Sequence, residues 1–307
     1  MRSAEVTGVV LASASAVSYG VTVVVGRALA TSGIGPATAL GLRFAITALL
    51  VAMVLGLRRA PLRPARGERL RVFLLGAIGY GGEATLFYLS LQRGTAAAAA
   101  LLFYAYPAIV TVIELAVGWA RPSPRSLLAL GLSCLGTVLV VASADRVSMS
   151  ATGAAMALAA AAIFAVYLVF NVRLVSRTHP LTQAGWVAAG GAVSTLGWAV
   201  FGDGIAVPAG EWPALLLYGA STAAAFALMF MALPRLGASQ IAVVMTLEAF
   251  SAVVLAALFL GESLTPVQAV GGVAILVATV SVAGRRRRPE PLPEELPCRR
   301  GRVAVRR

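Results

Sequence analysis

The sequence has no lysine, one histidine and two cysteines in 307 residues, and only 12% of its residues are charged. All 25 basic residues are therefore arginine. A soluble domain has about 25% charged residues, so the low charged fraction of this chain is typical of a protein with little surface exposed to water. The two cysteines, Cys134 and Cys298, lie far apart in the sequence, and the chain has only one histidine. This composition predicts neither a disulfide framework nor a metal site. We expect no cofactor.

Long apolar runs are what the chain has instead, since 59% of its residues are hydrophobic. Runs near 20 residues without charge recur along it, and each can cross about 30 Å of hydrocarbon as a helix. Hydropathy places ten such segments at residues 6–26, 36–57, 71–91, 95–119, 126–143, 151–171, 181–201, 212–233, 237–260 and 265–284. The sequence therefore predicts an all-α integral membrane protein with ten transmembrane helices.

The net charge of +13 comes from arginines that lie between the apolar segments and after the last one. A nucleic-acid-binding protein carries its basic residues on a folded polar face, so we expect no nucleic-acid partner. With a cytoplasmic N-terminus, the inner segments hold 21 arginines and the outer ones hold three, Arg27, Arg93 and Arg146. Because arginine-rich loops stay in the cytoplasm, both termini are predicted inside, in a multi-pass protein of a bacterial inner membrane.

One pattern occurs twice along the chain, at an offset of about 142 residues. Arg93 matches Arg235, and the turn at Pro36 matches the turn at Pro180. Because each copy has an odd number of spans, the copies lie in the bilayer in opposite orientations. We assign residues 1–146 and 147–284 to two inverted five-helix repeats, and residues 285–307 to a disordered basic cytoplasmic tail.

Three short motifs carry a resemblance to a known family. Tyr19-Gly20, Leu42-Arg43-Phe44 and the segment from Leu260 to Thr265 resemble the EamA family of the drug/metabolite transporter superfamily. The resemblance covers about residues 6–284 and implies ten spans in two repeats and secondary transport. It also implies export, because family members of known function are mostly exporters of amino acids and related metabolites. The sequence departs from the family pattern at Tyr19, where Trp is usual, and at Ala249, where Pro is common.

Charged side chains inside the predicted spans are candidate functional groups, because each costs roughly 2.5–3.5 kcal/mol at the bilayer centre. Glu83 lies between Tyr80 and Phe87 at helical steps of three and four, so an ammonium group could bind there by ion pairing and cation–π attraction. Alternatively, Glu83 pairs with Arg43 as a structural charge partner. Glu248 is a candidate protonatable coupling group or a second structural carboxylate. Glu114 is nearer the cytoplasmic end and is expected to extend its carboxylate toward the membrane surface or to pair with Arg121.

Pro107 interrupts the fourth span and predicts a helix break beside Tyr106. Breaks of this kind expose backbone groups near the midplane of transporters. Aromatic residues from several spans are predicted to line a substrate cavity there, although single aromatics in a span more often serve packing. The predicted substrate-binding residues are Tyr80, Glu83, Phe87, Tyr104, Tyr106, Phe164, Tyr167, Trp186 and Glu248.

These features predict a secondary transporter that exports amino acids, aromatic or hydrophobic ones included, or related small metabolites by alternating access through a midplane cavity. Its partners are then a small-molecule substrate and the lipid bilayer, and we expect it to function as a monomer. A broad-specificity drug or metabolite efflux carrier and a passive facilitator are the alternatives. A lipid-modifying membrane enzyme would need an interfacial nucleophile, base or metal cluster, and ATP hydrolysis would need a phosphate-binding loop; the sequence has neither pattern.

Overall fold

The computed structural model describes residues 2–30, 32–119, 123–142, 149–202, 204–260 and 264–283. Within them the chain is helical, and its one β-type pairing is an isolated bridge between Gly94 and Met149. The predicted tail 285–307, Glu262, Arg121 and Arg146 lie outside the described residues.

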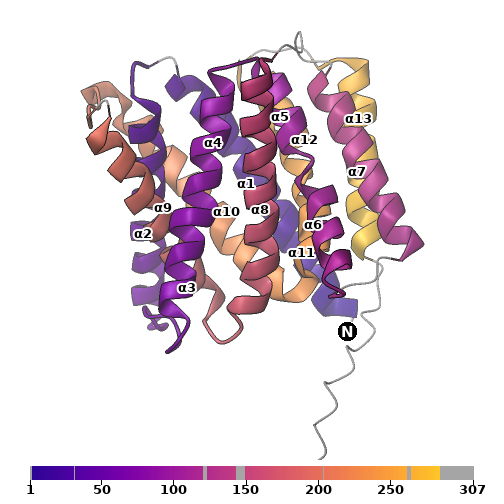
Figure 1. Ribbon diagram of the computed structural model, residues 1–307, viewed down its shortest axis with the longest axis horizontal. Helices are drawn as coiled ribbons and strands as arrows, with labels where there is room; N and C mark the ends of the chain where they lie inside the picture. The colour runs from indigo at the N-terminus through magenta and orange to yellow at the C-terminus, as the bar shows by residue number, and fades with distance from the viewer. Residues whose placement is uncertain are drawn as a thin grey trace, which may run out of the picture.

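The helices form ten rods, five in each half of the chain (Figure 1). The first half consists of α1 (Arg2–Ala30), α2 (Pro36–Leu57), a rod made of α3 (Arg69–Leu74), η1 (Leu75–Tyr80) and α4 (Gly81–Leu91), a rod made of α5 (Ala96–Phe103) and α6 (Tyr106–Ala116), and α7 (Pro124–Ala142). The second half consists of α8 (Ala151–Leu174), α9 (Pro180–Phe201), the short η2 (Ala209–Glu211) with α10 (Trp212–Leu236), a rod made of α11 (Ala238–Met245) and α12 (Leu247–Leu260), and α13 (Pro266–Ala283).

The exposed surface of the bundle is that of a membrane protein. In the described residues, nine helical rods are long and apolar enough to cross a bilayer, and the tenth, Pro266–Val282, is a shorter apolar helix. Large aliphatic and aromatic side chains lie on the outside, such as Leu57 at 79% exposed, Phe201 at 93% and Phe259 at 75%. An exposed apolar surface of this extent is stable only against lipid. The predicted all-α membrane fold is confirmed.

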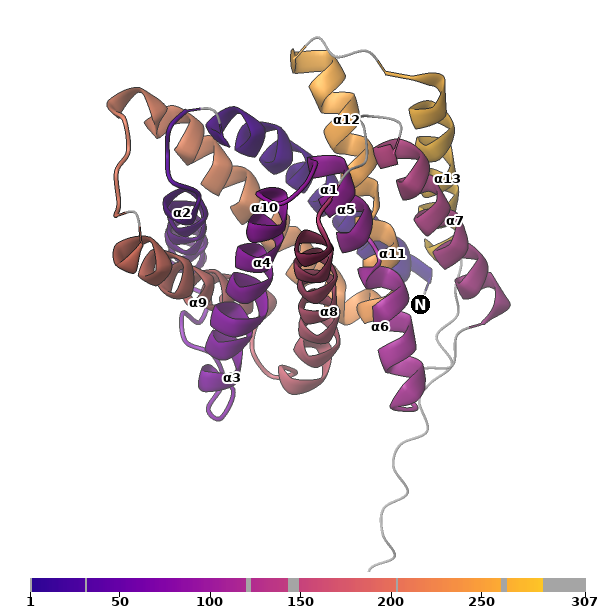
Figure 2. The ribbon, with the colours of Figure 1, turned by 45° about the horizontal axis from the view of Figure 1, so that its top comes forward.

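Packing between the rods follows a two-fold relation between the halves. α1 packs on α10, and its counterpart α8 packs on α4 and η1. Likewise α1 packs on α11 and α12, and α8 packs on α5 and α6. The pairs α2–α9 and α7–α13 consist of counterparts that pack on each other, and they lie at opposite sides of the bundle (Figure 2). This pattern is the one that inverted repeats produce.

Two glycines show the same relation at the level of single residues. Gly41 and Gly185 each lie five residues after the proline that opens their helix, Pro36 in α2 and Pro180 in α9. A Cβ at Gly41 would lie 2.5 Å from the Leu196 side chain, and a Cβ at Gly185 would lie 3.2 Å from Val51. Each glycine therefore receives an aliphatic side chain of the opposite helix, 16 residues after Pro180 for Leu196 and 15 after Pro36 for Val51, so the two contacts correspond to within one residue.

The chain departs from regular α-helix in three of the described spans, of which the sequence predicted a break only in the fourth, at Pro107. The third span contains a π-helix, η1, between α3 and α4. The fourth span breaks after α5, and α6 begins at Tyr106 with Pro107 in its first turn. The ninth span, predicted as one helix over 237–260, breaks at Thr246 between α11 and α12. The fourth and ninth spans are counterparts, so both halves are interrupted at corresponding places.

Backbone contact without side chains holds the η1 segment against α9. A Cβ added at Gly76 would lie closer than 3.0 Å to the carbonyl oxygen of Val187, and one at Gly190 would lie equally close to the carbonyl oxygen of Phe73. Small residues let helices in a membrane approach this closely, and van der Waals packing then stabilises the pair. This contact fixes the height at which Tyr80, the last residue of η1, enters the centre of the bundle.

We expect the Gly76→Ala substitution to destabilise the protein by about 1–3 kcal/mol, because the added methyl group overpacks a backbone contact. Gly82→Ala is the matched control, since a Cβ there meets no other atom within 4 Å in the described structure. Its effect should stay within about 1 kcal/mol. Thermal unfolding of both variants in detergent measures the difference. Equal midpoints for the two variants would contradict the close approach.

Candidate functional site

A cluster of aromatic rings fills the centre of the bundle, with Tyr80 at its middle. The Tyr80 ring meets Tyr167 at 5.4 Å between centroids and Phe226 at 4.9 Å, both edge to face. Phe44 and Phe164 pack on it in the same way, at 5.5 and 5.9 Å. Edge-to-face pairs of this kind stabilise beyond the area that they bury. The rings come from α2, η1, α8 and α10, so both halves of the chain build this central aromatic cluster.

A hydrogen bond between two hydroxyl groups links the cluster to the first helix. Tyr19 of α1 and Tyr80 lie 2.9 Å apart, oxygen to oxygen. Both side chains are buried, at 7% and 6% exposed. In a medium without water each hydroxyl needs such a partner, because an unpaired one costs several kcal/mol. The pair therefore ties α1 to the third span at the level of the cluster.

A second row of rings runs from the cluster to the break in the fourth span. Phe164 contacts Tyr106 at 4.9 Å and Phe103 at 5.6 Å between centroids. Phe103 in turn contacts Phe87 at 5.0 Å and Tyr104 at 5.9 Å. Eight of the nine predicted substrate-binding residues thus lie in or beside one continuous set of rings: Tyr80, Glu83, Phe87, Tyr104, Tyr106, Phe164, Tyr167 and Glu248.

The two interrupted spans meet beside this set of rings. The Tyr106 hydroxyl at the start of α6 donates to the carbonyl oxygen of Ala242 in α11, at 3.3 Å. Ser239 of α11 donates to the Glu114 carboxylate of α6. Arg121, the partner predicted for Glu114, lies outside the described residues, so that pairing stays a prediction. Because Pro107 has no N–H, the carbonyl of Phe103 loses its helical donor at the break. Backbone acceptors near the rings are the groups that a substrate can use.

Three charged side chains surround the cluster. Glu83, one turn after Tyr80, is 7% exposed, and Glu248 lies in the first turn of α12, directly after the break at Thr246. The Arg43 guanidinium lies 4.5 Å from the Phe44 ring centroid and 5.1 Å from the Tyr218 ring centroid. Arg43, Glu83 and Glu248 act on one another electrostatically. Within the described part of the chain, however, no ion pair forms between Arg43 and either carboxylate.

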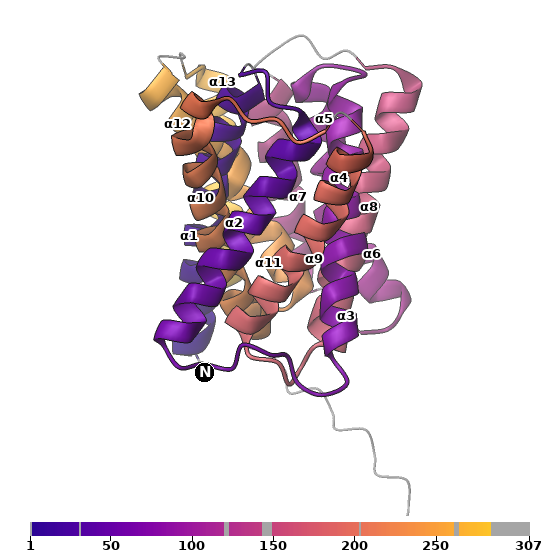
Figure 3. The same ribbon diagram turned by 90° about the vertical axis from the view of Figure 1, so that its left-hand side faces the viewer.

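The end of the bundle that holds the N-terminus is closed by a contact between two loops (Figure 3). Glu68, between α2 and α3, accepts hydrogen bonds from the backbone N–H groups of Ser176, Arg177 and Thr178 at 3.2, 3.1 and 3.0 Å. The Thr178 hydroxyl donates to the same carboxylate at 2.6 Å. Successive N–H groups that converge on one anion form a concave binding site for it. This Glu68 clamp joins the first half of the chain to the second.

The environment of Glu68 changes its pKa in two opposite directions. Burial of the carboxylate would raise the pKa, but the hydrogen bonds from Thr178, Arg177 and Ser176 outweigh burial and hold it below its ordinary value of 4.5. A carboxylate that accepts several hydrogen bonds is stabilised in its charged form. The clamp is therefore fully charged at neutral pH.

Trp186 is the predicted site residue that lies apart from the rings. Its indole N–H donates to the carbonyl oxygen of Leu62, in the loop between α2 and α3, at 2.9 Å. That loop also carries Glu68, so Trp186 belongs to the closed end of the bundle. The sequence could not tell a residue of the central rings from one at the closed end of the bundle. An aromatic residue in the first turns of a helix is compatible with either position.

Sequence reasoning missed several residues of the cluster. Tyr19, Phe44, Phe226 and Tyr218 all contact Tyr80, Arg43 or each other, and none was proposed as part of the site. Tyr218 and Phe226 lie in an apolar helix that has several aromatic residues, so no local signal separates them from packing residues. Tyr19 lies in the Tyr19-Gly20 motif, which pointed to the family and not to the site. Phe44 is the exception, because it follows the intramembrane Arg43 directly in the sequence.

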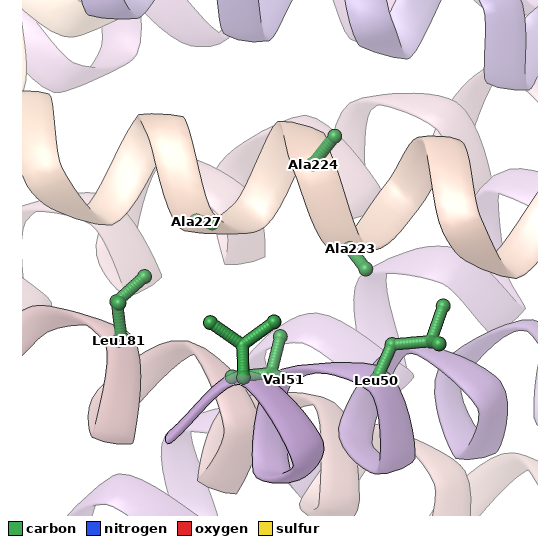
Figure 4. A pocket seen from close by; sticks show the side chains of 7 residues that line it. Leu50, Val51, Leu181, Ala223, Ala224 and Ala227 are labelled. Carbon is green, nitrogen blue, oxygen red and sulfur yellow. The ribbon is translucent and has the colours of Figure 1, made fainter. Parts of the chain in front are cut away.

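A small pocket also lies between α2, α9 and α10, with a volume of about 160 Å³ (Figure 4). Leu50, Val51 and Leu181 face the α10 helix that carries Ala223 across it (Figure 4). All seven lining residues are aliphatic. Such a surface can hold hydrocarbon but cannot orient a polar solute, so the charged aromatic cluster is the candidate site.

The sequence profile of the EamA-like transporter family matches this chain twice, over residues 6–142 and 151–284. The chain belongs to the EamA-like transporter family. The family lies in the drug/metabolite transporter superfamily, and this member is a multi-pass inner membrane transporter and not an enzyme. The resemblance that the sequence motifs carried is confirmed. The exact division of the chain at residue 146, and the disorder of the tail, stay predictions.

Several known proteins are similar to this EamA-like transporter over most of their length. The threonine/homoserine exporter RhtA of Salmonella typhimurium strain SL1344 is 32% identical over 239 residues, which cover 75% of this chain and 76% of that protein. RhtA of Escherichia coli strain K12 is 31% identical over 228 residues, which cover 71% and 72%. A crystal structure of another protein, 22% identical, has the same fold with a TM-score of 0.73, over 88% of this chain and 98% of that one.

We expect the Glu68→Gln substitution to destabilise the EamA-like transporter by about 2 kcal/mol at pH 7, because hydrogen bonds to a charged acceptor are the strong ones. Since the folded-state pKa of Glu68 is lowered, its contribution is complete above pH 4.5 and is lost as the pH falls through the lowered value. The difference between wild type and variant should therefore shrink on acidification. Unfolding midpoints measured from pH 7 downwards test this, with Glu211→Gln at the other end of the bundle as control. A difference that does not change with pH would argue against the clamp.

Proposed function

We propose that this EamA-like transporter exports amino acids or closely related small metabolites by alternating access. The observation that carries the proposal is the central aromatic cluster, built by both halves beside two interrupted helices and surrounded by Arg43, Glu83 and Glu248. Interrupted helices at corresponding positions of two inverted repeats mark the substrate site in secondary transporters. The relatives named as threonine/homoserine exporters support amino acids as the substrate class.

The burial of the cluster supports a mechanism in which access is controlled by movement. Tyr80, Tyr106 and Tyr167 are only 6%, 2% and 1% exposed, so a substrate reaches them after helices separate. The Glu68 clamp holds one end of the bundle closed. Inverted repeats allow the two halves to rock about a fixed central site and to open each end in turn.

The arginines support an orientation with both termini in the cytoplasm. The end of the bundle that holds the N-terminus and the α2–α3 and α8–α9 loops carries most of the described arginines (Figure 3). They include Arg58, Arg59, Arg63, Arg66, Arg69, Arg71, Arg173 and Arg177. Arginine-rich loops remain on the cytoplasmic side of the membrane. The Glu68 clamp is then a cytoplasmic closure, and the protein works as a monomer because its site lies within one chain.

Counterflow in liposomes tests the proposal directly. Proteoliposomes loaded with unlabelled threonine, homoserine or phenylalanine should take up the same labelled amino acid faster than liposomes without protein. Repeating the assay with and without a proton gradient separates coupled transport from passive facilitation. Movement of cationic drugs in preference to amino acids would favour a broad-specificity efflux carrier. If none of these compounds moves, the proposed function is wrong.

Glu83→Gln should lower the rate of amino acid counterflow by about tenfold or more, because the neutral amide cannot pair with a substrate ammonium in a dry site. The unfolding midpoint should stay near that of wild type, since Gln has the same shape and Glu83 forms no ion pair within the described residues. Glu211→Gln, the same chemical change outside the bundle centre, should leave transport unchanged. A variant with normal transport, or one that loses folded protein together with transport, would assign Glu83 a structural role.

A further inference from the structure

Arg43 lies where a charged side chain is costly, and the described residues satisfy it only in part. It is two turns into α2, and its Nη1 atom donates to the Tyr218 hydroxyl of α10 at a long 3.3 Å. Its Nε atom is buried and has no hydrogen-bond partner among the residues that the structure describes. A guanidinium has five N–H donors, so most of its capacity is available to another group.

Two aromatic rings lie against the guanidinium. Phe44 and Tyr218 lie against it at 4.5 and 5.1 Å from the ring centroids. Cation–π contacts of this kind hold a charged group in place without using its N–H donors. Phe44 also packs on Tyr80, so the position of Arg43 is fixed relative to the central aromatic cluster.

The two carboxylates near Arg43 form no direct ion pair with it in the described residues. Glu83 and Glu248 act on Arg43 electrostatically, yet neither forms an ion pair with it in the described part of the chain. If Arg43 were only a structural partner of Glu83, direct contact would be the favoured arrangement, because a separated pair in low dielectric loses most of its attraction while both groups stay desolvated. Both carboxylates thus lie beyond ion-pairing distance of the guanidinium. A solute that carries both charges would bridge them once the helices around the cluster separate.

A free amino acid has the required chemistry. Its carboxylate matches the planar fork of a guanidinium, which binds carboxylates with two parallel hydrogen bonds. Its ammonium group matches a buried carboxylate beside aromatic rings. Bound in this way, one solute would satisfy both unpaired protein charges, whereas an amine or an acid alone would leave one of them unpaired.

We propose that Arg43 binds the substrate carboxylate, while Glu83 binds the ammonium group of the same amino acid. This assignment rests on the proposed function and adds the requirement for a free carboxylate. Arg43 is then a substrate-binding residue that selects zwitterions, in place of the structural partner of Glu83 that the sequence alone predicted.

The test compares substrates with and without a carboxylate. Wild type, Arg43→Gln and Arg43→Lys are reconstituted, and the counterflow rates of threonine and phenylalanine are measured against those of their amino alcohols, threoninol and phenylalaninol. Wild type should prefer the amino acid by about tenfold or more, since one charge-assisted contact is at stake. In Arg43→Gln this preference should fall to about twofold, mainly through slower transport of the amino acid. Arg43→Lys should restore part of the preference, because it keeps the charge but not the fork.

The controls separate the possible failures. Glu211→Gln changes a carboxylate outside the bundle centre, so it should keep the preference for amino acids within about twofold of wild type. Equal losses for amino acid and amino alcohol in Arg43→Gln would overturn the assignment and leave Arg43 structural. An unchanged preference would overturn it too. If Arg43→Gln does not fold, the preference of Arg43→Lys decides, since a value equal to wild type excludes recognition by the fork. If wild type moves no amino acid, the proposed function itself has failed.

Discussion

A polar group inside this bundle is costly unless the protein or a bound solute supplies its partner, because the surrounding hydrocarbon offers none. That constraint explains the helices, which satisfy their own backbone, and it singles out the places where they are interrupted. The breaks before Tyr106 and after Thr246 leave backbone groups that only neighbouring helices or a solute can satisfy. The same constraint gives the Tyr19–Tyr80 hydroxyl pair its importance, since it satisfies two buried hydroxyl groups at once.

The architecture follows from the repeat, and the chemistry follows from the departures from it. Equivalent contacts such as Gly41 with Leu196 and Gly185 with Val51 build the two-fold scaffold. The charged groups are unequally shared: Arg43 and Glu83 belong to the first half, and Glu248 to the second. A symmetric frame that carries an asymmetric set of charges can bind a solute with distinct ends in one orientation.

Hydropathy and arginine placement were enough to predict the number of helical rods and their inverted arrangement, because both depend on composition over long windows. The finer features depend on tertiary contacts. The π-helix at Leu75–Tyr80 forms where Gly76 lets the backbone contact Val187. The helix break at Thr246 has no proline in the sequence that would predict it. The sequence also could not predict that Trp186 lies at the closed end, because its hydrogen bond to the Leu62 carbonyl in the α2–α3 loop is a tertiary contact.

The contacts of Gly41 with Leu196 and of Gly185 with Val51 bear on how the two halves insert into the membrane in opposite orientations. Two contacts that correspond to within one residue are close to what two identical five-helix units would make around a two-fold axis. As separate chains, those units would have to insert in both orientations in equal numbers before they could associate. When the two units are joined in one chain, the orientation of the first unit in the membrane fixes that of the second during synthesis. The arginine-rich loops of both units can then lie at the same end of the bundle.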